Sequence, residues 1–217
     1  LTLMGSEAAE VASAYGIPAA PVILPTTPEE AVAAAGKLGY PVVLKVASPK
    51  ILHKSDVGGV KTGIQTPEEV RRAFIEIMES VNRYLPKVII YGIEVQKMMP
   101  KGTELIVGMT RDVQFGPLIA FGLGGIYVNL FKDVSFRLAS GLTGTRQIEE
   151  MLAETKAFTL LRGYRGEPPR DLAAVVDVIR CTDRLVTDFP EINEMDINPL
   201  VAYEKGLSAL DIKITIS

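Results

Sequence analysis

The segment best suited to phosphate chemistry is SPKILHKSDVGGVK, residues 48–61. It contains His53, the only histidine of the chain, next to Lys54 and the glycine pair Gly58-Gly59. Lysine ammonium groups attract phosphate, and glycine lets backbone N–H groups approach an anion closely. This combination indicates an anion-binding loop, although a glycine pair that only forms a turn is the alternative.

Lys45 lies just upstream of this loop, inside the strand-like run YPVVLKV. Lysine is rarely buried without a partner, so a lysine within such an apolar strand needs an explanation. One explanation is a phosphate ligand at the base of the loop. The other is a lysine that faces solvent on an edge strand.

Oxygen ligands for a metal occur near the C-terminus, in EMDINPLVAY and LSALDIKITI. A hairpin around Glu204–Gly206 would place Asn198 opposite Asp211. An amide and a carboxylate oxygen suit Mg²⁺, which takes one or two protein ligands and leaves the rest to water and substrate phosphates. An ordinary cross-strand polar pair at a sheet edge is the alternative, but the apolar neighbours of Asp211 disfavour it.

The segment IEVQKMMPKGTELIVG, residues 93–108, alternates polar with apolar residues. This alternation is typical of half-buried strands, so Glu94, Gln96 and Glu104 need no chemical role to explain them. Met98 and Met99 either fill gaps in the core or form the wall of an adenine pocket, and taken alone the core is favoured.

The two common nucleotide fingerprints are absent. No G-x-x-x-x-G-K-[ST] occurs, and GLGGIY (122–127) lacks the third glycine and the later acidic residue of the dinucleotide motif. A phosphate site in this chain would therefore use a different architecture.

Composition favours a soluble intracellular protein. The net charge is −3, and no block of lysine and arginine exceeds two residues, which argues against nucleic-acid binding. No apolar run reaches the roughly 18 residues of a membrane span, and the N-terminus lacks the basic segment of a signal peptide. The single cysteine, Cys181, excludes an internal disulfide. We therefore expect a cytoplasmic protein that binds neither nucleic acid nor membrane.

The first ninety residues alternate between helix and strand. The sequence TPEE occurs twice, at Thr27–Glu30 and Thr66–Glu69. Each copy predicts a helix with threonine as N-cap and proline at the first helical position. Strands are expected at 21–24, 41–46 and 60–65, the second of them buried on both faces.

The second half of the chain favours antiparallel strands. IEVQKMM, TELIVGMTR and PLIAFGL are separated by only a few turn residues, so we expect neighbours to pair antiparallel. Helices are expected from Thr145 to about Arg162 and from Asp171 to Asp188. The predicted fold class is α/β (α+β), with one α+β lobe over 1–91 and another over 92–217.

Six motifs resemble, in order, the ATP-grasp β subunit of NDP-forming acyl-CoA synthetases, the ADP-forming acetate–CoA ligases. They are VVLKVAS, LHKSDVGGVKTGI, VQKMMPKGTELIVGMTRDVQFGP, FGLGGIYV, KDVSFRLA and EMDINPLVAY…ALDIKI. The resemblance runs from about residue 5 to the end, and a more distant one is to the succinyl-CoA synthetase β subunit. It implies an ATP-grasp fold whose two subdomains enclose a nucleotide cleft. Residues 1–91 would carry the phosphate loop, and 92–217 the adenine hinge and the Mg²⁺ site.

The resemblance also implies a role for each matched residue. Lys45 would contact the phosphates, and His53 would relay the phosphoryl group as phosphohistidine or, alternatively, only donate a hydrogen bond to it. Asn198 and Asp211 match the Mg²⁺ ligands. The implied nucleotide-binding residues are Lys45, Lys54, Ser55, Gly58, Gly59, Val60, Gln96, Met98, Met99 and Glu104. Among these, Gln96 to Met99 would form the adenine hinge and Glu104 would bind ribose.

Members of this family act with an α subunit that binds CoA and carries a phosphohistidine, in an αβ or α2β2 assembly. The implied reaction is acyl-CoA + ADP + phosphate = acid + ATP + CoA. A swinging segment of the α subunit delivers the phosphoryl group to the nucleotide site of β. No CoA-binding Rossmann unit is recognisable in this sequence, so we expect the chain to need this partner.

Two positions depart from the family pattern. Asn129 stands where many relatives carry glutamate, and Ser140-Gly141 replaces a common proline, which leaves details of the cleft open. The alternative function is a nucleotide-sensing regulatory domain, as in ATP-grasp domains fused to an acetyltransferase. A different ATP-grasp ligase that acts by itself is disfavoured by the length of the chain. Retention of Lys45 and His53 together with the two metal-ligand matches favours the phosphotransfer enzyme.

Overall fold

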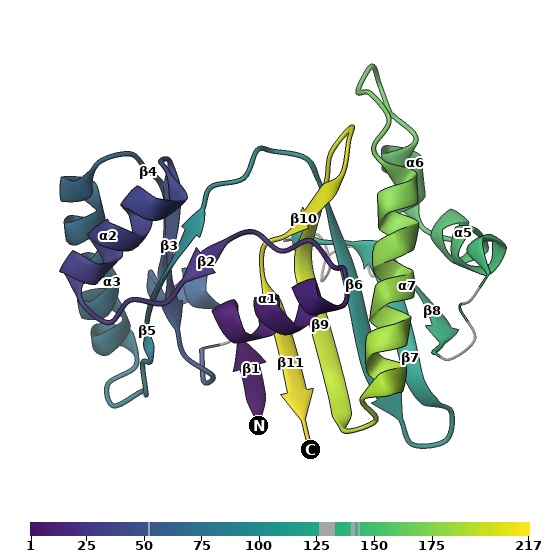
Figure 1. Cartoon of the computed structure of the whole chain (residues 1–217), viewed down its shortest axis with the longest axis horizontal. Helices are drawn as coiled ribbons and strands as arrows, with labels where there is room; N and C mark the ends of the chain where they lie inside the picture. Colours follow the sequence, from purple (N-terminus) through teal and green to yellow (C-terminus); the bar gives the residue numbers. More distant parts are fainter. Residues whose placement is uncertain (52, 126–132, 140–141, 143) are drawn as a thin grey trace. The chain divides into compact units, whose positions relative to one another are not determined.

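A computed structural model describes residues 1–51, 53–125, 133–139, 142 and 144–217 (Figure 1). These residues form two compact units. Unit 1 comprises Leu1–Leu3, Glu10–Ala19 and Lys101–Ser217, and unit 2 comprises Met4–Ala9 and Ala20–Pro100. The functional division into subdomains 1–91 and 92–217 stays a prediction. Asn129 and Ser140-Gly141, the two departures from the family pattern, lie outside the described residues.

Unit 2 is a four-stranded antiparallel sheet with two helices against one face (Figure 1). The strand order is β2-β5-β3-β4. Both helices begin as their TPEE motifs predict, because Thr27 and Thr66 each accept the N–H of the glutamate three residues on. The elements are β2 (Val22–Ile23), α2 (Pro28–Leu38), β3 (Val42–Ala47), the 3-10 helix η1 (Lys54–Val57), β4 (Val60–Ile64), α3 (Pro67–Tyr84) and β5 (Gly92–Lys97).

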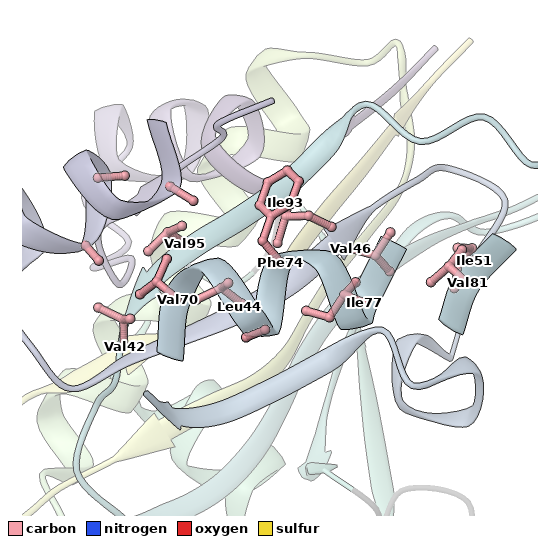
Figure 2. Packing of buried hydrophobic residues seen from close by; sticks show 14 residues of the cluster. Val42, Leu44, Val46, Ile51, Val70, Phe74, Ile77, Val81, Ile93 and Val95 are labelled. Atoms are coloured by element: carbon pink, nitrogen blue, oxygen red, sulfur yellow. The ribbon is translucent and has the colours of Figure 1, made fainter. Parts of the chain in front are cut away.

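The core of unit 2 lies between this sheet and the helices. Val42, Leu44 and Val46 of β3 are fully buried and pack with Phe74 and Ile77 of α3 (Figure 2). The residues between them on β3 are only half-buried, so the strand alternates. The prediction of a strand buried on both faces was therefore wrong, and the second face is available to polar side chains.

Unit 1 is built on a larger antiparallel sheet of order β1-β11-β9-β6-β7-β8, with β10 paired to β9. Helix α7 packs on β6 and β7 (Figure 1). The helix expected from 145 to 162 is two helices, because Thr155 caps a new one by accepting the N–H of Phe158. The strands are β1 (Thr2–Met4), β6 (Thr103–Asp112), β7 (Gly116–Leu123), β8 (Val134–Leu138), β9 (Ile192–Ala202), β10 (Leu207–Ala209) and β11 (Ile212–Ile216), and the helices are α5 (Thr145–Ala153), α6 (Lys156–Leu161) and α7 (Leu172–Asp188). Helix α1 (Gly5–Ala14) is divided between the units, with residues 5–9 in unit 2 and residues 10–14 in unit 1.

One predicted strand pair was wrong. Strands β6 and β7 pair antiparallel as expected, but β5 and β6 belong to different sheets. The connection Pro100–Gly102 joins the two units instead of closing a hairpin. A short segment of proline, lysine and glycine has the composition of a turn in either case, so the sequence does not distinguish the two.

The C-terminal hairpin follows the predicted register. Leu207 pairs with Ala202 and Ile212 with Ile197. Asp211 lies in the break between β10 and β11, and its carbonyl accepts the N–H of Asn198 at 3.0 Å. Because β9 lies between β11 and β6, this is not a sheet edge, and the edge-pair alternative is excluded. Among the described residues, no helix combines the length and the apolar character that a membrane span requires.

Candidate functional site

Lys45 projects from the face of the unit 2 sheet opposite the hydrophobic core. Strand β3 lies between β5 and β4, so the alternative of an edge strand is wrong. The Lys45 ammonium is half-buried and donates a hydrogen bond from Nζ to Gln96 Oε1 at 2.7 Å. Gln96 and Glu94 on β5 are only 6% and 4% exposed. This face therefore carries a lysine whose position is fixed by a buried polar neighbour.

The loop from β3 to β4 rejoins the sheet beside Lys45. His53 is exposed and directly precedes η1. The Gly58 N–H donates to Ser55 O at 3.1 Å, and the Gly59 N–H donates to Lys54 O at 2.7 Å. In this structure both glycine amides thus bond within the loop, and their contact with phosphate stays a prediction. Val60, at the start of β4, pairs with Lys45.

The predicted adenine hinge, Gln96 to Met99, lies at the end of β5. The Met98 N–H donates to Pro41 O at 3.0 Å, and Lys97 Nζ donates to the carbonyls of Gly39 and Tyr40. Met98 is 36% exposed and Met99 is half-buried, so neither belongs to the buried core and the core alternative is wrong. Their role at an adenine ring stays a prediction.

In unit 1, a second group of predicted residues meets around Gly125. The Gly125 N–H donates to Asn198 Oδ1 at 2.8 Å. Any side chain at Gly125 would collide with the Glu104 carboxylate, and any side chain at Gly124 would collide with the backbone of Leu105. The glycines of FGLGG thus let this segment lie against β6. They let Gly125 lie next to both Glu104 and Asn198.

Asp196 also belongs to this group, although the sequence predicted no role for it. It lies two residues before Asn198 on β9, so both side chains project from the same face of the sheet. Burial, together with the negative charges of Asp211 and Glu194, raises the pKa of Asp196 to about 6. The pattern Asp-x-Asn within a strand is the signal that could have identified it.

Mg²⁺ fits this set of donors. Asn198 and Asp211 offer one amide and one carboxylate oxygen, the hard ligands that Mg²⁺ prefers. A divalent cation would also relieve the repulsion that Asp211 exerts on Asp196. Across the described residues, no group of three or more His, Cys, Asp and Glu could hold a metal by itself. That is compatible with Mg²⁺, which completes its octahedron with water and substrate phosphates.

The structure therefore brings the predicted residues together in two groups. Lys45, Gln96 and the base of the 53–60 loop lie together in unit 2. Glu104, Asn198 and Asp211 lie together in unit 1. One group contains the lysine predicted to bind phosphate, and the other contains the oxygen atoms predicted to bind a metal; both roles stay predictions.

Two α+β units, one with a lysine-bearing loop and one with an oxygen-bearing strand pair, are the arrangement expected for the ATP-grasp class. The family model described as ATP-grasp domain matches residues 1–216. The chain is 46% identical over 214 residues to the acetate–CoA ligase [ADP-forming] I subunit beta of Pyrococcus furiosus, which covers 99% of this chain and 91% of that protein. It therefore belongs to the ATP-grasp family of ADP-forming acetate–CoA ligase β subunits.

Two further likenesses extend this finding. The acetate–CoA ligase [ADP-forming] I of Archaeoglobus fulgidus is 46% identical over 214 residues, which are 99% of this chain but only 31% of that longer protein. The chain thus spans about a third of this relative. The structure of Candidatus Korarchaeum cryptofilum acetyl-coenzyme A synthetase 1 with coenzyme A and Ca-AMPCP matches with a TM-score of 0.94 and 46% identity, covering 100% of this chain and 93% of that chain. This match confirms the predicted ATP-grasp fold.

Proposed function

We propose that the chain is the nucleotide-binding phosphotransfer subunit of an ADP-forming acetyl-CoA synthetase. The reaction is acyl-CoA + ADP + phosphate = acid + ATP + CoA. Full-length similarity to a β subunit of this enzyme class supports the assignment. The observation that carries it is the joint presence of the Lys45 group on one unit and the Glu104–Asn198–Asp211 group on the other.

In this proposal the chain contributes positioning and charge neutralisation, which phosphoryl transfer requires more than covalent machinery. Lys45 and Lys54 offset the negative charge of the phosphates. Asn198 and Asp211, with Asp196 beside them, hold Mg²⁺, which when bound neutralises further phosphate charge. The segment Gln96 to Met99 contacts adenine, and Glu104 accepts hydrogen bonds from ribose.

His53 is the proposed phosphoryl relay. Imidazole is a competent nucleophile and forms covalent intermediates in enzymes. His53 is exposed, so a donor can reach it. In the first step the bond from phosphorus to a histidine of the partner breaks as a bond to His53 forms. In the second step that bond breaks as a terminal phosphate oxygen of ADP takes the phosphoryl group, which gives ATP.

The proposed partner is an α subunit that binds CoA and carries the donor histidine, in an αβ or α2β2 assembly. The Pyrococcus relative is named as one subunit of an enzyme, and the Archaeoglobus relative is about three times as long as this chain. The Korarchaeum enzyme with coenzyme A and Mg-AMPPCP, 43% identical to this chain, is described with its phosphohistidine segment pointing towards the nucleotide binding site. That description supports delivery of the phosphoryl group by a moving segment.

Co-expression with a CoA-binding α subunit of this enzyme class tests this function. The complex should form ATP from acetyl-CoA, ADP and phosphate, and its His53→Ala variant should not. After quenching in alkali, wild-type chain should carry an acid-labile label from radioactive phosphate that the variant lacks. Unimpaired ATP formation by His53→Ala would remove the relay. A stable complex without turnover, in which nucleotide controls another activity, would favour the sensor instead.

A further inference from the structure

The loop that carries His53 is tied to helix α3 by a side chain outside the predicted site. Ser80 is half-buried on α3, and its Oγ donates a hydrogen bond to Val57 O, the last carbonyl of η1, at 2.9 Å. One helical turn earlier, Glu76 Oε2 accepts a hydrogen bond from Lys61 Nζ on β4 at 2.7 Å. Helix α3 thus holds the loop at its turn and again just after it.

The contact with Ser80 requires glycine at position 58. Gly58 has φ +66°, a left-handed conformation that favours glycine, and an added Cβ would lie 2.5 Å from Ser80 Oγ. An added Cβ at Gly59 would lie 2.6 Å from Val46 Cγ1 and 2.8 Å from Lys54 O. The two glycines therefore let the turn pack between α3 on one side and β3 on the other.

The same turn fixes the backbone on which the two functional side chains are carried. The Lys54 carbonyl accepts the Gly59 N–H at 2.7 Å, and the His53 carbonyl accepts the Asp56 N–H at 3.2 Å. Movement of the turn away from Ser80 would therefore move the backbone of both residues. The exposed imidazole at the start of η1 depends on this support for its position.

We propose that Ser80 and Gly58 form a latch, and that Ser80 is a positioning residue for His53 and Lys54. Effective phosphoryl transfer requires the reacting groups at a fixed distance and angle, so a loosened loop slows the transfer. ADP binding also uses Lys45 and the hinge, so it depends less on the latch. The consequence for turnover rests on the proposed function, whereas the latch itself rests on the contacts above.

Ser80→Ala tests the latch directly, because alanine removes the hydroxyl and is a good helix former. Asn82→Ala, two residues on and exposed, is the matched control on the same helix. Loss of one hydrogen bond should raise amide exchange at Gly58 and Gly59 about five- to tenfold, and trypsin cleavage after Lys54 by a similar factor. The control should match wild type in both. Equal protection in Ser80→Ala and wild type would overturn the latch.

Gly58→Ala provides a second test, since its added methyl displaces the Ser80 hydroxyl. Both substitutions break the same contact, and alanine at position 80 also removes the atom that the added methyl meets, so amide exchange in the double variant should be no faster than in Gly58→Ala alone. If the increase in exchange rate in the double variant were the product of the increases in the two single variants, the two residues would act independently and the latch would be refuted.

In the complex with the partner, Ser80→Ala should lower kcat about tenfold and change the KM for ADP less than twofold. An unchanged kcat would remove the positioning role. The exchange measurements need no nucleotide, so they stand even if the chain does not transfer phosphate. Normal ADP binding with unchanged loop exchange would instead overturn the latch and leave the proposed function intact.

Discussion

The substitution Gln96→Glu adds one negative charge beside Lys45 with almost no change in side-chain size. Gln96 Oε1 lies 2.7 Å from Lys45 Nζ, so the new carboxylate would form a charge-assisted hydrogen bond there. At an effective dielectric constant of about 20, two unit charges about 4 Å apart interact by about 4 kcal/mol. The added carboxylate therefore repels a phosphate bound at Lys45 with an energy of this order. Solvent and rearrangement reduce it, and we expect ADP binding to weaken by about 1.4 to 2.8 kcal/mol, or about 10- to 100-fold in Kd.

Isothermal titration calorimetry with ADP and Mg²⁺ measures this loss. Gln65→Glu is the matched control, because it adds the same charge at an exposed position of the same unit. The control should bind like wild type, and circular dichroism should show that Gln96→Glu is folded at the temperature of the titration. Wild-type affinity in a folded Gln96→Glu variant would refute the assignment of Lys45 to the phosphates.

Three further predictions concern stability and reactivity. Asp171→Ala should destabilise the chain by about 1 to 2 kcal/mol in urea unfolding, because the carboxylate accepts the first-turn N–H of α7 and the N–H of Gly206. These bonds lower the pKa of Asp171, so its contribution is present above the ordinary pKa of about 3.9 and is lost as pH falls through the lower folded value. The free energy of unfolding of Asp171→Ala should therefore fall less than that of wild type as the pH is lowered through this range. Gly59→Ala should lower the melting temperature, because its added Cβ meets Val46 and Lys54. Gly36→Ala has nothing within 4 Å of its added Cβ and should raise stability by up to about 1 kcal/mol. Equal shifts of the melting temperature in the two variants would contradict this difference in packing. Burial raises the pKa of the Cys181 thiol, so at pH 8 it should react with a chromogenic disulfide more slowly than free cysteine does, and an equal rate would contradict its burial.

Local chemistry made several elements predictable from the sequence. A threonine that accepts a backbone N–H at a helix start acts within four residues, so both TPEE motifs identify the beginnings of α2 and α3. The turn at Glu204–Gly206 sets the register of the C-terminal hairpin, so Asn198 could be placed opposite Asp211. In both cases the bonded residues are close in sequence, so the contact forms without help from distant parts of the chain.

Other features depend on contacts between distant residues and could not be predicted in this way. The turn-like Pro100–Gly102 segment joins two units, and only the pairing of β5 with β3 reveals it. The amides of Gly58 and Gly59 bond to nearby carbonyls of the loop, and the turn packs against Ser80 and Val46 from two other elements. A glycine pair in a sequence does not show which atoms will surround it.

We propose that Lys45 and the Asn198–Asp211 pair both contribute to binding a magnesium nucleotide. Calorimetric titration of the chain with ADP, with Mg²⁺ and then with EDTA, tests it most directly. We predict one saturable site whose affinity falls at least about tenfold without metal and in both Lys45→Met and Asp211→Asn. The absence of binding heat with every purine di- and triphosphate, with or without Mg²⁺, would contradict the claim.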